Sequence, residues 1–332
     1  MKCCFIVTYF GKLPDSFAVF LKTCGWNKNF SWLLFTDNDS GYNYPENFKV
    51  VRMKFKELKS LVDLKFGFHV ALEKAYKLCD LRPAFGYIFE DYISEFEFWG
   101  HCDVDTIMGK LDDFITDKLL EKYDKLFCLG HFVLYRNSYE NNRVFMAEHN
   151  GEYLYKKVFV NPKSCWFDEE WHNDNNINQI FLCQGKRVFQ EDWSANFDIN
   201  TLRFQRIMFS GKEVAPETRG YVHEGFKNAL YIWNCGRTFR IHQVDRKLVC
   251  EEFMYMHFQQ RKMRFRQNIL NTESFKIVPN AFVKIKKIPE TPAEFKRIRK
   301  SVVCPDAVYR EYKRLLTRIQ RNWKKIVEKV FY

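Results

Sequence analysis

The chain has 332 residues, of which 46% are hydrophobic and 18% aromatic, so it can bury a substantial core and is not an intrinsically disordered chain. Its formal charge of +12 is unevenly spread, because residues 284–332 carry fifteen Lys and Arg against five Asp and Glu. This distribution argues against a uniformly basic surface for nucleic acid and favours a basic tail on a near-neutral folded domain.

Segments that would place the protein in a membrane or outside the cell are not evident. No apolar run approaches the roughly 20 residues of a membrane span. The opening MKCCFIVTYFG is typical of a short buried strand rather than an export signal. The eleven cysteines form no C-x-x-C pair, which argues against a zinc ribbon or a thioredoxin-like motif. We therefore expect reduced cysteines and a cytoplasmic protein.

The first part of the chain predicts an open α/β sheet. Buried strands are expected at 3–9, 31–39 and 48–55. Residues 14–24 predict a helix between the first two strands. Ligands bind beyond the carboxyl ends of the strands in such sheets. Thr8 and Asp37 lie near the ends of two of these strands and are candidate nucleotide contacts, although both also fit ordinary turns.

Two helical patterns come next. The first covers residues 61–79, and the second is aromatic and begins near Pro83. Asp80 and Arg82 lie at the junction between them. An Asp at this place could accept hydrogen bonds from sugar hydroxyls, and an Arg could offset phosphate charge. The alternative is an Asp that caps a helix beside a surface Arg.

The stretch EFEFWGHCDVDTIMGKL, residues 95–111, organises the rest of the chain. Phe and Glu alternate as in a half-buried strand, and His101, Asp103 and Asp105 then follow at two-residue spacing, which in extended backbone sends side chains to one side. Two converging carboxylates repel unless a cation lies between them, and such oxygen ligands suit Mg²⁺ or Mn²⁺. A metal-bound diphosphate is the expected ligand. A solvated turn with two capping Asp residues is the alternative.

Two blocks of sequence carry a resemblance to a known family. CDLRPAFG, residues 79–86, together with FWGHCDVDTIMG, residues 98–109, resembles the GT-A class of nucleotide-sugar-dependent glycosyltransferases, within a bacterial group associated with capsule, O-antigen and other surface polysaccharides. The resemblance extends from the N-terminus to about residue 270. It implies an α/β fold of the GT-A type, with a Rossmann-like mixed sheet flanked by helices. The composition of residues 284–332 adds a C-terminal basic helical appendage to this expectation.

The resemblance also implies a division of the chain and of its roles. It predicts a glycosyltransferase domain at 1–283, with a donor-binding half at about 1–112 and an acceptor-binding half at about 113–283. Asp103 and Asp105 match the D-x-D pair that holds the divalent ion on the donor diphosphate. His101 is predicted to be a donor contact. Asp80 and Arg82 match positions that contact the donor sugar and its phosphates.

A strand expected at 125–137 carries His131, a possible acceptor contact, although a lone His is more often structural. Residues 165–176, CWFDEEWHNDNN, form an acidic cluster flanked by Trp166 and Trp171, a composition that suits an acceptor sugar. A carboxylate here could take the acceptor hydroxyl proton as general base. The resemblance favours Asp168 or Glu169, without deciding between them. The alternative is an acidic helix start.

The stretch VCEEFMYMHFQQRKMRF, residues 249–265, resembles a closing block of the same family, H-x-x-K/Q-R-K-M. By that resemblance His257 is the third protein ligand of the metal, and Arg261 and Lys262 lie near the donor phosphates. Gln260 occupies the position that is commonly Lys, which weakens the argument for a cation there. A helix with a solvated basic face is the alternative.

The remainder, residues 284–332, is expected to be a basic linker followed by an amphipathic cationic helix. Such a helix can lie in an anionic membrane interface, which would place the protein peripherally at the inner face of the cell membrane. The helix could equally pack on its own domain or on a partner.

Taken together, these features predict a Mn²⁺- or Mg²⁺-dependent enzyme without nucleic-acid partners. It would move a sugar from a nucleotide-diphosphate donor, preferentially a UDP-sugar, to a hydroxyl of a glycan or lipid-linked oligosaccharide in bacterial surface polysaccharide synthesis. One alternative is a metal-dependent phosphodiesterase or nuclease that uses His101 with the D-x-D pair and a second metal cluster at 168–174. Another is a non-enzymatic protein that binds an anionic surface through the tail.

Overall fold

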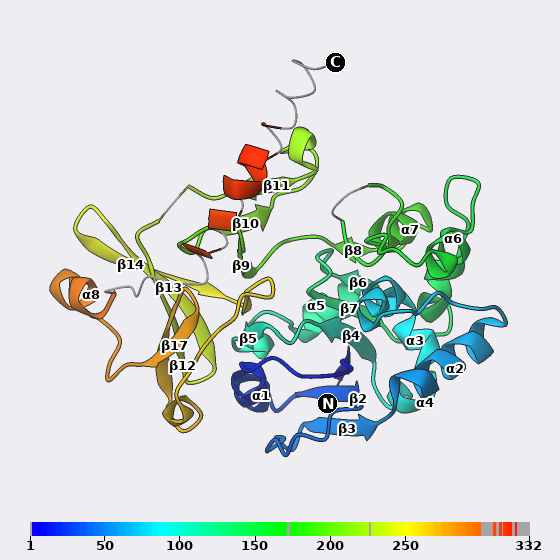
Figure 1. Ribbon diagram of the computed structural model, residues 1–332, viewed down its shortest axis with the longest axis horizontal. Coiled ribbons are helices and arrows are strands. Elements are labelled where there is room, and N and C mark those ends of the chain that lie inside the picture. Colours follow the sequence, from blue (N-terminus) through cyan, green and yellow to red (C-terminus); the bar gives the residue numbers. More distant parts are fainter. Residues whose placement is uncertain are drawn as a thin grey trace.

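The computed structural model describes residues 2–170, 173–225 and 227–299, together with 308–309, 312–313, 315–320 and 323. The described chain forms a mixed α/β fold with three β-sheets, and most of its helices surround the first sheet (Figure 1). The mixed α/β class predicted from the sequence is therefore confirmed. Its assignment to the GT-A type and the division into domains stay predictions.

The first sheet has seven strands in the order β3-β2-β1-β4-β7-β6-β8. Their bounds are β1 (Cys3–Thr8), β2 (Phe30–Thr36), β3 (Phe48–Arg52), β4 (Phe98–Cys102), β6 (Lys125–Leu126), β7 (Phe132–Arg136) and β8 (Val188–Phe189). β1 pairs in parallel with both β2 and β4, so the strand order reverses at the β1–β4 junction. In open α/β sheets the carboxyl ends of strands at such a junction border the ligand site.

Both faces of this sheet are buried because successive side chains of each central strand enter different cores. Phe5 and Val7 of β1 pack with helix α1 (Phe17–Gly25), whereas Cys4 and Ile6 belong to the core on the opposite face. Strands covered on both faces read as continuous apolar runs, which explains why they were predicted correctly from the sequence.

The helical region between β3 and β4 differs from the prediction. The helix predicted at 61–79 is wrong: α2 (Phe55–Phe66) ends where Gly67 adopts a left-handed conformation with φ 69°. A ten-residue 3₁₀ helix, η1 (Ala75–Ala84), follows after a loop. The aromatic helix predicted near Pro83 is two short helices, α3 (Phe85–Ile88) and α4 (Glu90–Ile93).

The other helical elements are short. They are η2 (Leu111–Asp113), α5 (Asp117–Lys122), η3 (Asn141–Met146), α6 (Leu154–Val160), α7 (Ile177–Cys183), η4 (Pro216–Thr218), η5 (Gln267–Ile269) and α8 (Pro292–Arg299). Within the described part of the chain, no helix has both the length and the apolar character needed to cross a membrane.

The second sheet and the first sheet border a common cavity. It has the strand order β11-β10-β9-β15-β5, with β5 (Thr106–Met108), β9 (Ser194–Phe197), β10 (Arg206–Phe209), β11 (Tyr221–His223) and β15 (Tyr255–His257). Because β5 follows β4 directly in the chain, this sheet begins beside the D-x-D stretch. Antiparallel pairing of β5 with β15 brings residues 255–257 next to it.

The third sheet is antiparallel and has the order β14-β13-β12-β16-β17. Its strands are β12 (Leu230–Asn234), β13 (Arg237–Val244), β14 (Lys247–Phe253), β16 (Ser274–Val278) and β17 (Ala281–Lys284). Helix α8 lies against this sheet, where Phe295 packs with Leu230, Ile232 and Ile241. Part of the predicted basic linker is therefore a packed helix, because Phe295 finds an apolar surface on the sheet.

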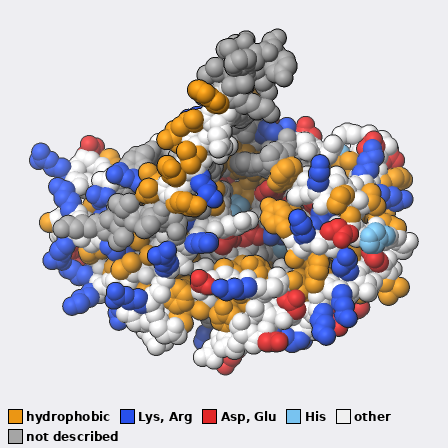
Figure 2. Space-filling model, viewed as in Figure 1, with side chains coloured by type: hydrophobic (Ala, Val, Ile, Leu, Met, Phe, Trp, Pro, Cys, Tyr) orange, Lys and Arg blue, Asp and Glu red, His pale blue; other side chains and the backbone are white. Residues whose placement is uncertain are grey.

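Only parts of the predicted C-terminal helix lie within the described residues, and these are helical. Apolar side chains at these positions are exposed: Val308, Tyr309, Tyr312, Leu315, Leu316, Ile319 and Trp323. Figure 2 shows hydrophobic side chains in orange at the top of the molecule. The predicted contact of this helix with a membrane or a partner stays a prediction.

Candidate active site

A cavity of about 1390 Å³ lies between the first and second sheets. On one side it is bordered by the carboxyl ends of β1 and β4, represented by Thr8 and Asp103, and on the other by β9, β10, β11 and β15 of the second sheet. It therefore occupies the place that the reversal of strand order at β1–β4 indicates for a ligand.

The candidate metal centre consists of Asp103, Asp105 and His257, whose ligand atoms all lie within 4.8 Å of one another. The sheet register causes this convergence, since β15 pairs with β5 so that His257 lies opposite Thr106. The Nε2 atom of His257 is 3.5 Å from Oδ2 of Asp103 and 3.5 Å from Oδ1 of Asp105. The three residues that were predicted to bind the metal are therefore close in space, although His257 follows Asp103 and Asp105 by more than 150 positions in the sequence.

The residues fit a divalent ion. Neighbouring ligand atoms of an octahedral ion with bonds of ~2.1 Å lie about 3 Å apart, close to the separations found here. The Nδ1 atom of His257 lies 3.0 Å from Oδ1 of Asn196, on the adjacent strand β9. If Nδ1 donates its proton to that oxygen, Nε2 is left to act as a ligand, as is usual for metal-bound His.

The charges of the three residues are interdependent. Burial lowers the pKa of His257, but the carboxylates of Asp105 and Asp103 more than offset this and hold it above its usual value. Burial raises the pKa of Asp105, and His257 together with the backbone N–H of Gln260 brings it below its usual value. Two carboxylates and one imidazole thus attract positive charge, which a proton or a divalent ion can supply.

Arg82 joins the candidate metal centre to a second pair of carboxylates. Its Nη2 donates to Oδ1 of Asp103, and its Nη1 lies 3.0 Å from Oδ2 of Asp168 and 2.8 Å from the carbonyl oxygen of Gly130. Arg82 lines the cavity. The guanidinium that was predicted to offset phosphate charge is therefore engaged by two carboxylates of the protein.

Asp168 and Glu169 also line the cavity, next to Gly130. A Cβ atom at Gly130 would lie 2.9 Å from Oδ2 of Asp168 and 3.1 Å from Oε2 of Glu169, so glycine allows both carboxyl groups to approach the backbone. Burial raises the pKa of Asp168 to about 6, in spite of Arg82. Burial and the neighbouring Asp168 raise the pKa of Glu169 to about 8. Such groups hold protons near neutral pH, which suits acid–base catalysis.

Helix η1 supplies several of these side chains because a 3₁₀ helix has three residues per turn and aligns positions i and i+3. Tyr76, Cys79 and Arg82 line the cavity along one face, whereas Lys77 and Asp80 are buried along the next. The third face contributes to the hydrophobic core through Leu78, Leu81 and Ala84.

The structure does not place Asp80 in the cavity wall as a donor contact. Asp80 is fully buried, and its two carboxylate oxygens accept from Lys77 Nζ at 2.7 Å, the Cys165 N–H at 2.8 Å and the Phe167 N–H at 3.0 Å. The prediction of a direct donor contact is corrected because Asp80 and Arg82 lie on different faces of η1. Asp80 instead fixes the loop that leads to Asp168 and Glu169.

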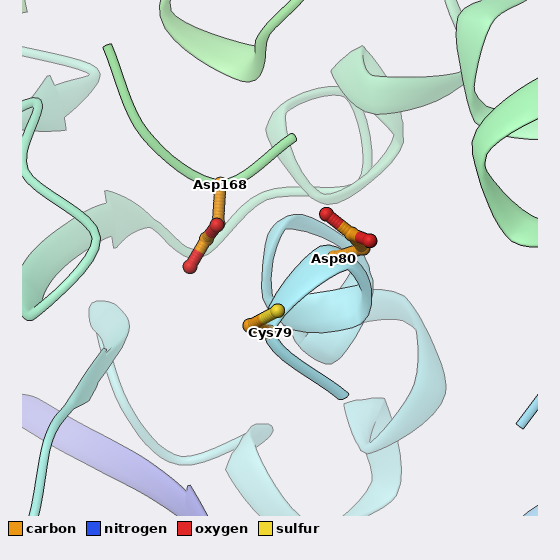
Figure 3. A group of neighbouring side chains, drawn as sticks. All are labelled: Cys79, Asp80 and Asp168. Carbon is orange, nitrogen blue, oxygen red and sulfur yellow. The ribbon is translucent and has the colours of Figure 1, made fainter. Parts of the chain in front are cut away.

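A second group of metal-ligating residue types, Cys79, Asp80 and Asp168, lies at the same wall. Figure 3 shows Cys79 and Asp80 on one helical turn with Asp168 on the loop opposite, and their ligand atoms lie within 4.8 Å of one another. Lys77 and Arg82 already pair with the two carboxylates, and burial raises the pKa of the Cys79 thiol to about 12. The charges here are compensated by side chains, so this group is a poor metal site.

The other two predicted donor residues differ in position. His101 lies within β4 at 1% exposure and borders the cavity, but it is not one of the candidate metal ligands, and its donor contact stays a prediction. Burial and the charges of Arg82 and Lys125 lower the pKa of His101 well below its usual value. Asp37 is exposed and does not line the cavity; its Oδ1 accepts from the Gly11 N–H at 2.7 Å and so supports the loop after β1.

The remaining predicted residues divide into cavity and framework positions. Lys262 is exposed and lines the cavity, as does Thr8. Arg261 also borders the cavity, but it is 2% exposed and donates to the carbonyl oxygens of Asp198 and Thr201. These two contacts use Nη2 alone, and the predicted phosphate contact of Arg261 stays a prediction.

The predicted acceptor residues are only partly described. His131 lines the cavity, where its Nδ1 lies 2.7 Å from the Tyr255 hydroxyl and its ring packs at 4.2 Å on that of His257. Trp166 is 41% exposed and lines the cavity. Trp171 lies outside the described residues.

Among the described residues of the acidic stretch, Glu170 and Asp174 belong to neither candidate metal group. Glu170 and Asp174 both pair with Lys212 and Arg219, which hold the loop between β10 and β11. Both carboxylates are thus neutralised by cationic side chains of the described structure. His172, another member of the predicted cluster, lies outside the described residues.

Sequence reasoning missed Asn196, Gly130, Tyr76 and Lys77. Asn196 and Gly130 carry no local signal, since their roles depend on strand register and on a loop from elsewhere in the chain. Tyr76 and Lys77 could have been found from a period of three residues over 75–84, which the prediction of an α-helix concealed.

Comparison with known proteins places the chain in a family. Residues 5–286 match the model described as "Family of unknown function (DUF6625)". The chain belongs to this family. The DUF6625 region includes every predicted site residue named above. None of the curated proteins matches the chain.

Among solved structures, the DUF6625 chain is similar to one titled "crystal structure of a glycosyltransferase involved in the glycosylation of the major capsid of PBCV-1". The identity is 10%, the match covers 67% of this chain and 93% of that one, and the TM-score is 0.32. A likeness of this size carries no argument about activity. The resemblance of the DUF6625 chain to a bacterial surface-polysaccharide group stays a prediction.

Proposed function

We propose that this protein is a metal-dependent glycosyltransferase that moves a sugar from a nucleotide-diphosphate donor to a hydroxyl of a carbohydrate acceptor. The observation that carries the proposal is the convergence of Asp103, Asp105 and His257 beside the carboxyl pair Asp168 and Glu169, in one cavity at the reversal of strand order. A metal site for a diphosphate and a proton acceptor for a hydroxyl are the two parts that such a transfer needs.

Asp103, Asp105 and His257 would hold Mn²⁺ or Mg²⁺. When bound, the ion would supply positive charge for the diphosphate of the donor. Asn196 fixes the imidazole ring of His257, and the backbone N–H of Gln260 fixes the carboxylate of Asp105. These contacts hold the side chains of His257 and Asp105 in position before the donor binds. Less conformational freedom of these side chains is therefore lost on binding.

The carboxyl pair acts on the acceptor. Oδ2 of Asp168 is engaged by Arg82, whereas Glu169 lies beside the cavity with its pKa raised to about 8. We therefore assign the positioning of Arg82 to Asp168 and the proton acceptor to Glu169, which accepts a proton only in its ionised form and is fully ionised only above its pKa of about 8. The acceptor oxygen forms a bond to the anomeric carbon, the bond to the diphosphate oxygen breaks with its electron pair on the leaving group, and the hydroxyl proton passes to Glu169.

The finer assignments follow from the sequence. A UDP-hexose is the proposed donor because D-x-D enzymes commonly use UDP-sugars. A glycan or lipid-linked oligosaccharide of a bacterial surface polysaccharide is the proposed acceptor, which rests on the resemblance of the blocks at 79–86 and 98–109 alone. The proposed location is the cytoplasm, with peripheral attachment of the basic tail to the inner face of the membrane.

The test is a survey of UDP-, GDP- and CDP-sugars with Mn²⁺, in which release of the nucleoside diphosphate is measured with and without a panel of saccharide acceptors. We expect release with one donor class, increased by an acceptor and abolished by EDTA or by Asp105→Asn. Asp91→Asn is the matched control, because Asp91 is exposed on α4 and does not line the cavity. Metal-independent release, or equal release by Asp105→Asn, would overturn the proposal.

A further inference from the structure

Two large aromatic side chains line the cavity while remaining exposed. Tyr76, on η1, is 65% exposed, and Trp166, on the loop before Asp168, is 41% exposed. Both lie near the carboxyl pair, since the charges of Glu169 and Asp168 act on the Tyr76 hydroxyl and Trp166 precedes Asp168 by two residues. Exposed aromatic surface in a polar cavity is a common feature of binding sites.

The backbone of Trp166 has an unusual conformation. Its φ angle is 53°, in the left-handed region, which a bulky residue rarely adopts. Backbone outliers of this kind persist only where the surrounding structure over-determines them, and they cluster at ligand sites. The fold thus maintains a costly conformation that presents an indole ring at the cavity.

Asp80 is the residue that maintains it. Its carboxylate accepts the backbone N–H groups of Cys165 and Phe167, one on each side of Trp166. Asp80 pairs in turn with Lys77, whose Nζ also donates to the carbonyl oxygens of Val158 at 2.9 Å and Lys163 at 2.8 Å. The polar contacts of the buried pair of Lys77 and Asp80 are made within the protein. Through these contacts the pair connects the loop that carries Trp166 with helix η1, which carries Tyr76.

The charge around the two rings restricts what they can bind. The neighbouring carboxyl groups are Asp168 and Glu169, and Lys77 and Arg82, the nearby cations of η1, are already engaged by Asp80, Asp103 and Asp168. The pKa of Asp168 is about 6, so its carboxylate is ionised at neutral pH, and a phosphate or carboxylate group placed here would meet this like charge. A neutral sugar ring is suited to the site, because its C–H face can pack on an aromatic ring while its hydroxyls donate to carboxylates.

We propose that Trp166 and Tyr76 form a platform for an uncharged sugar ring of the acceptor, and that Asp80 positions this platform. The inference rests on the proposed function and extends it by naming the class of acceptor. The ring on the platform would be the one whose hydroxyl reaches Glu169. An acceptor that is a free lipid phosphate or an acidic sugar would not fit.

Binding can be tested without turnover. Wild-type protein with UDP and Mn²⁺ is titrated with neutral disaccharides, such as lactose and cellobiose, and with glucuronic acid, and tryptophan fluorescence is recorded. We expect a saturable change with a neutral sugar that is lost in Trp166→Ala, retained in Tyr153→Ala and not produced by glucuronic acid. Tyr153 is a matched control, because it is 51% exposed and does not line the cavity. A change that persists in Trp166→Ala would overturn the inference.

Kinetics separates this inference from the proposed function. With the best neutral acceptor, Trp166→Ala and Tyr76→Ala should raise the acceptor KM by about tenfold, with the affinity for UDP and Mn²⁺ unchanged. Asp80→Asn should raise the acceptor KM in the same way, and Trp166→Phe should restore most of the loss in Trp166→Ala. Normal metal-dependent UDP binding with an unchanged acceptor KM in the Tyr76 and Trp166 variants refutes the platform alone. Loss of metal-dependent UDP binding by the wild type refutes the proposed function.

Discussion

The imidazole of His257 is oriented by Asn196, through a contact of 3.0 Å between Nδ1 and Oδ1 on adjacent strands. The other ring nitrogen lies 3.5 Å from a carboxylate oxygen of each of Asp103 and Asp105. The direction of the ring is therefore set by the second sheet, whereas the two carboxylates follow the end of β4 in the first sheet. The candidate metal centre exists only because these two sheets meet.

Asn196→Ala should weaken Mn²⁺ binding by roughly 10- to 100-fold, the usual effect of losing the partner of a metal-bound His. The ring of His257 would lose its orientation although all three ligands remain. Isothermal titration with Mn²⁺ measures the change, and Asn196→Asp, which retains an oxygen acceptor, should bind more tightly than Asn196→Ala. Equal affinities for wild type and Asn196→Ala would show that the ring is not oriented by this contact.

Cys79→Ser should leave Mn²⁺ affinity unchanged, whereas Asp103→Asn should reduce it by at least about tenfold. The reason is that the group of Cys79, Asp80 and Asp168 already has its charge offset by Lys77 and Arg82. The same titration distinguishes the two groups. Reduced Mn²⁺ affinity in Cys79→Ser would show that the metal binds at the group of Cys79, Asp80 and Asp168 and not at the D-x-D stretch.

Arg82→Lys should lower the rate of transfer by about tenfold or more, because a lysine ammonium cannot reproduce the forked contacts of the guanidinium with Asp103 and Asp168. Single-turnover kinetics with saturating donor measures the effect. Arg143→Lys is a suitable control, since Arg143 pairs with Glu90 and does not line the cavity. Equal rates of transfer for Arg82→Lys and Arg143→Lys would show that Arg82 has no role in the reaction.

Glu169→Gln should stabilise the metal-free protein at alkaline pH. Burial raises the pKa of Glu169 from its ordinary value of 4.5 to about 8, so between these values the folded chain holds a proton that the unfolded chain has lost. The stability contributed by this proton is fully present below pH 4.5 and is lost as the pH rises through 8. The Tm of Glu169→Gln minus that of wild type should therefore increase from pH 5 to pH 8 in EDTA. A difference that does not vary with pH would contradict this prediction.

Strand positions and the D-x-D stretch could be predicted from local sequence because they depend on local patterns. Apolar runs identified β1 and β2, and two-residue spacing identified Asp103 and Asp105. His257 was reached only through a resemblance, since its approach to Asp103 depends on the pairing of β5 with β15.

Other features could not be read locally. The sequence 61–79 has an α-helical pattern, but Gly67 ends the helix and the three-residue period of η1 then separates Asp80 from Arg82. Whether a polar side chain faces the cavity or the core depends on that period. Asp80 and Asp37 were assigned to the donor because sequence order does not distinguish a residue that lines the cavity from one that does not.

The central claim is that Asp103, Asp105 and His257 hold a divalent ion that binds a nucleoside diphosphate. Isothermal titration of wild type, Asp105→Asn and the Asp91→Asn control with UDP, GDP and CDP, each with Mn²⁺ or with EDTA, tests it most directly. We expect one nucleotide to bind wild type and Asp91→Asn with Mn²⁺ only, and at least about tenfold weaker binding to Asp105→Asn. Nucleotide binding that is the same in EDTA, or the same in Asp105→Asn, would contradict the claim.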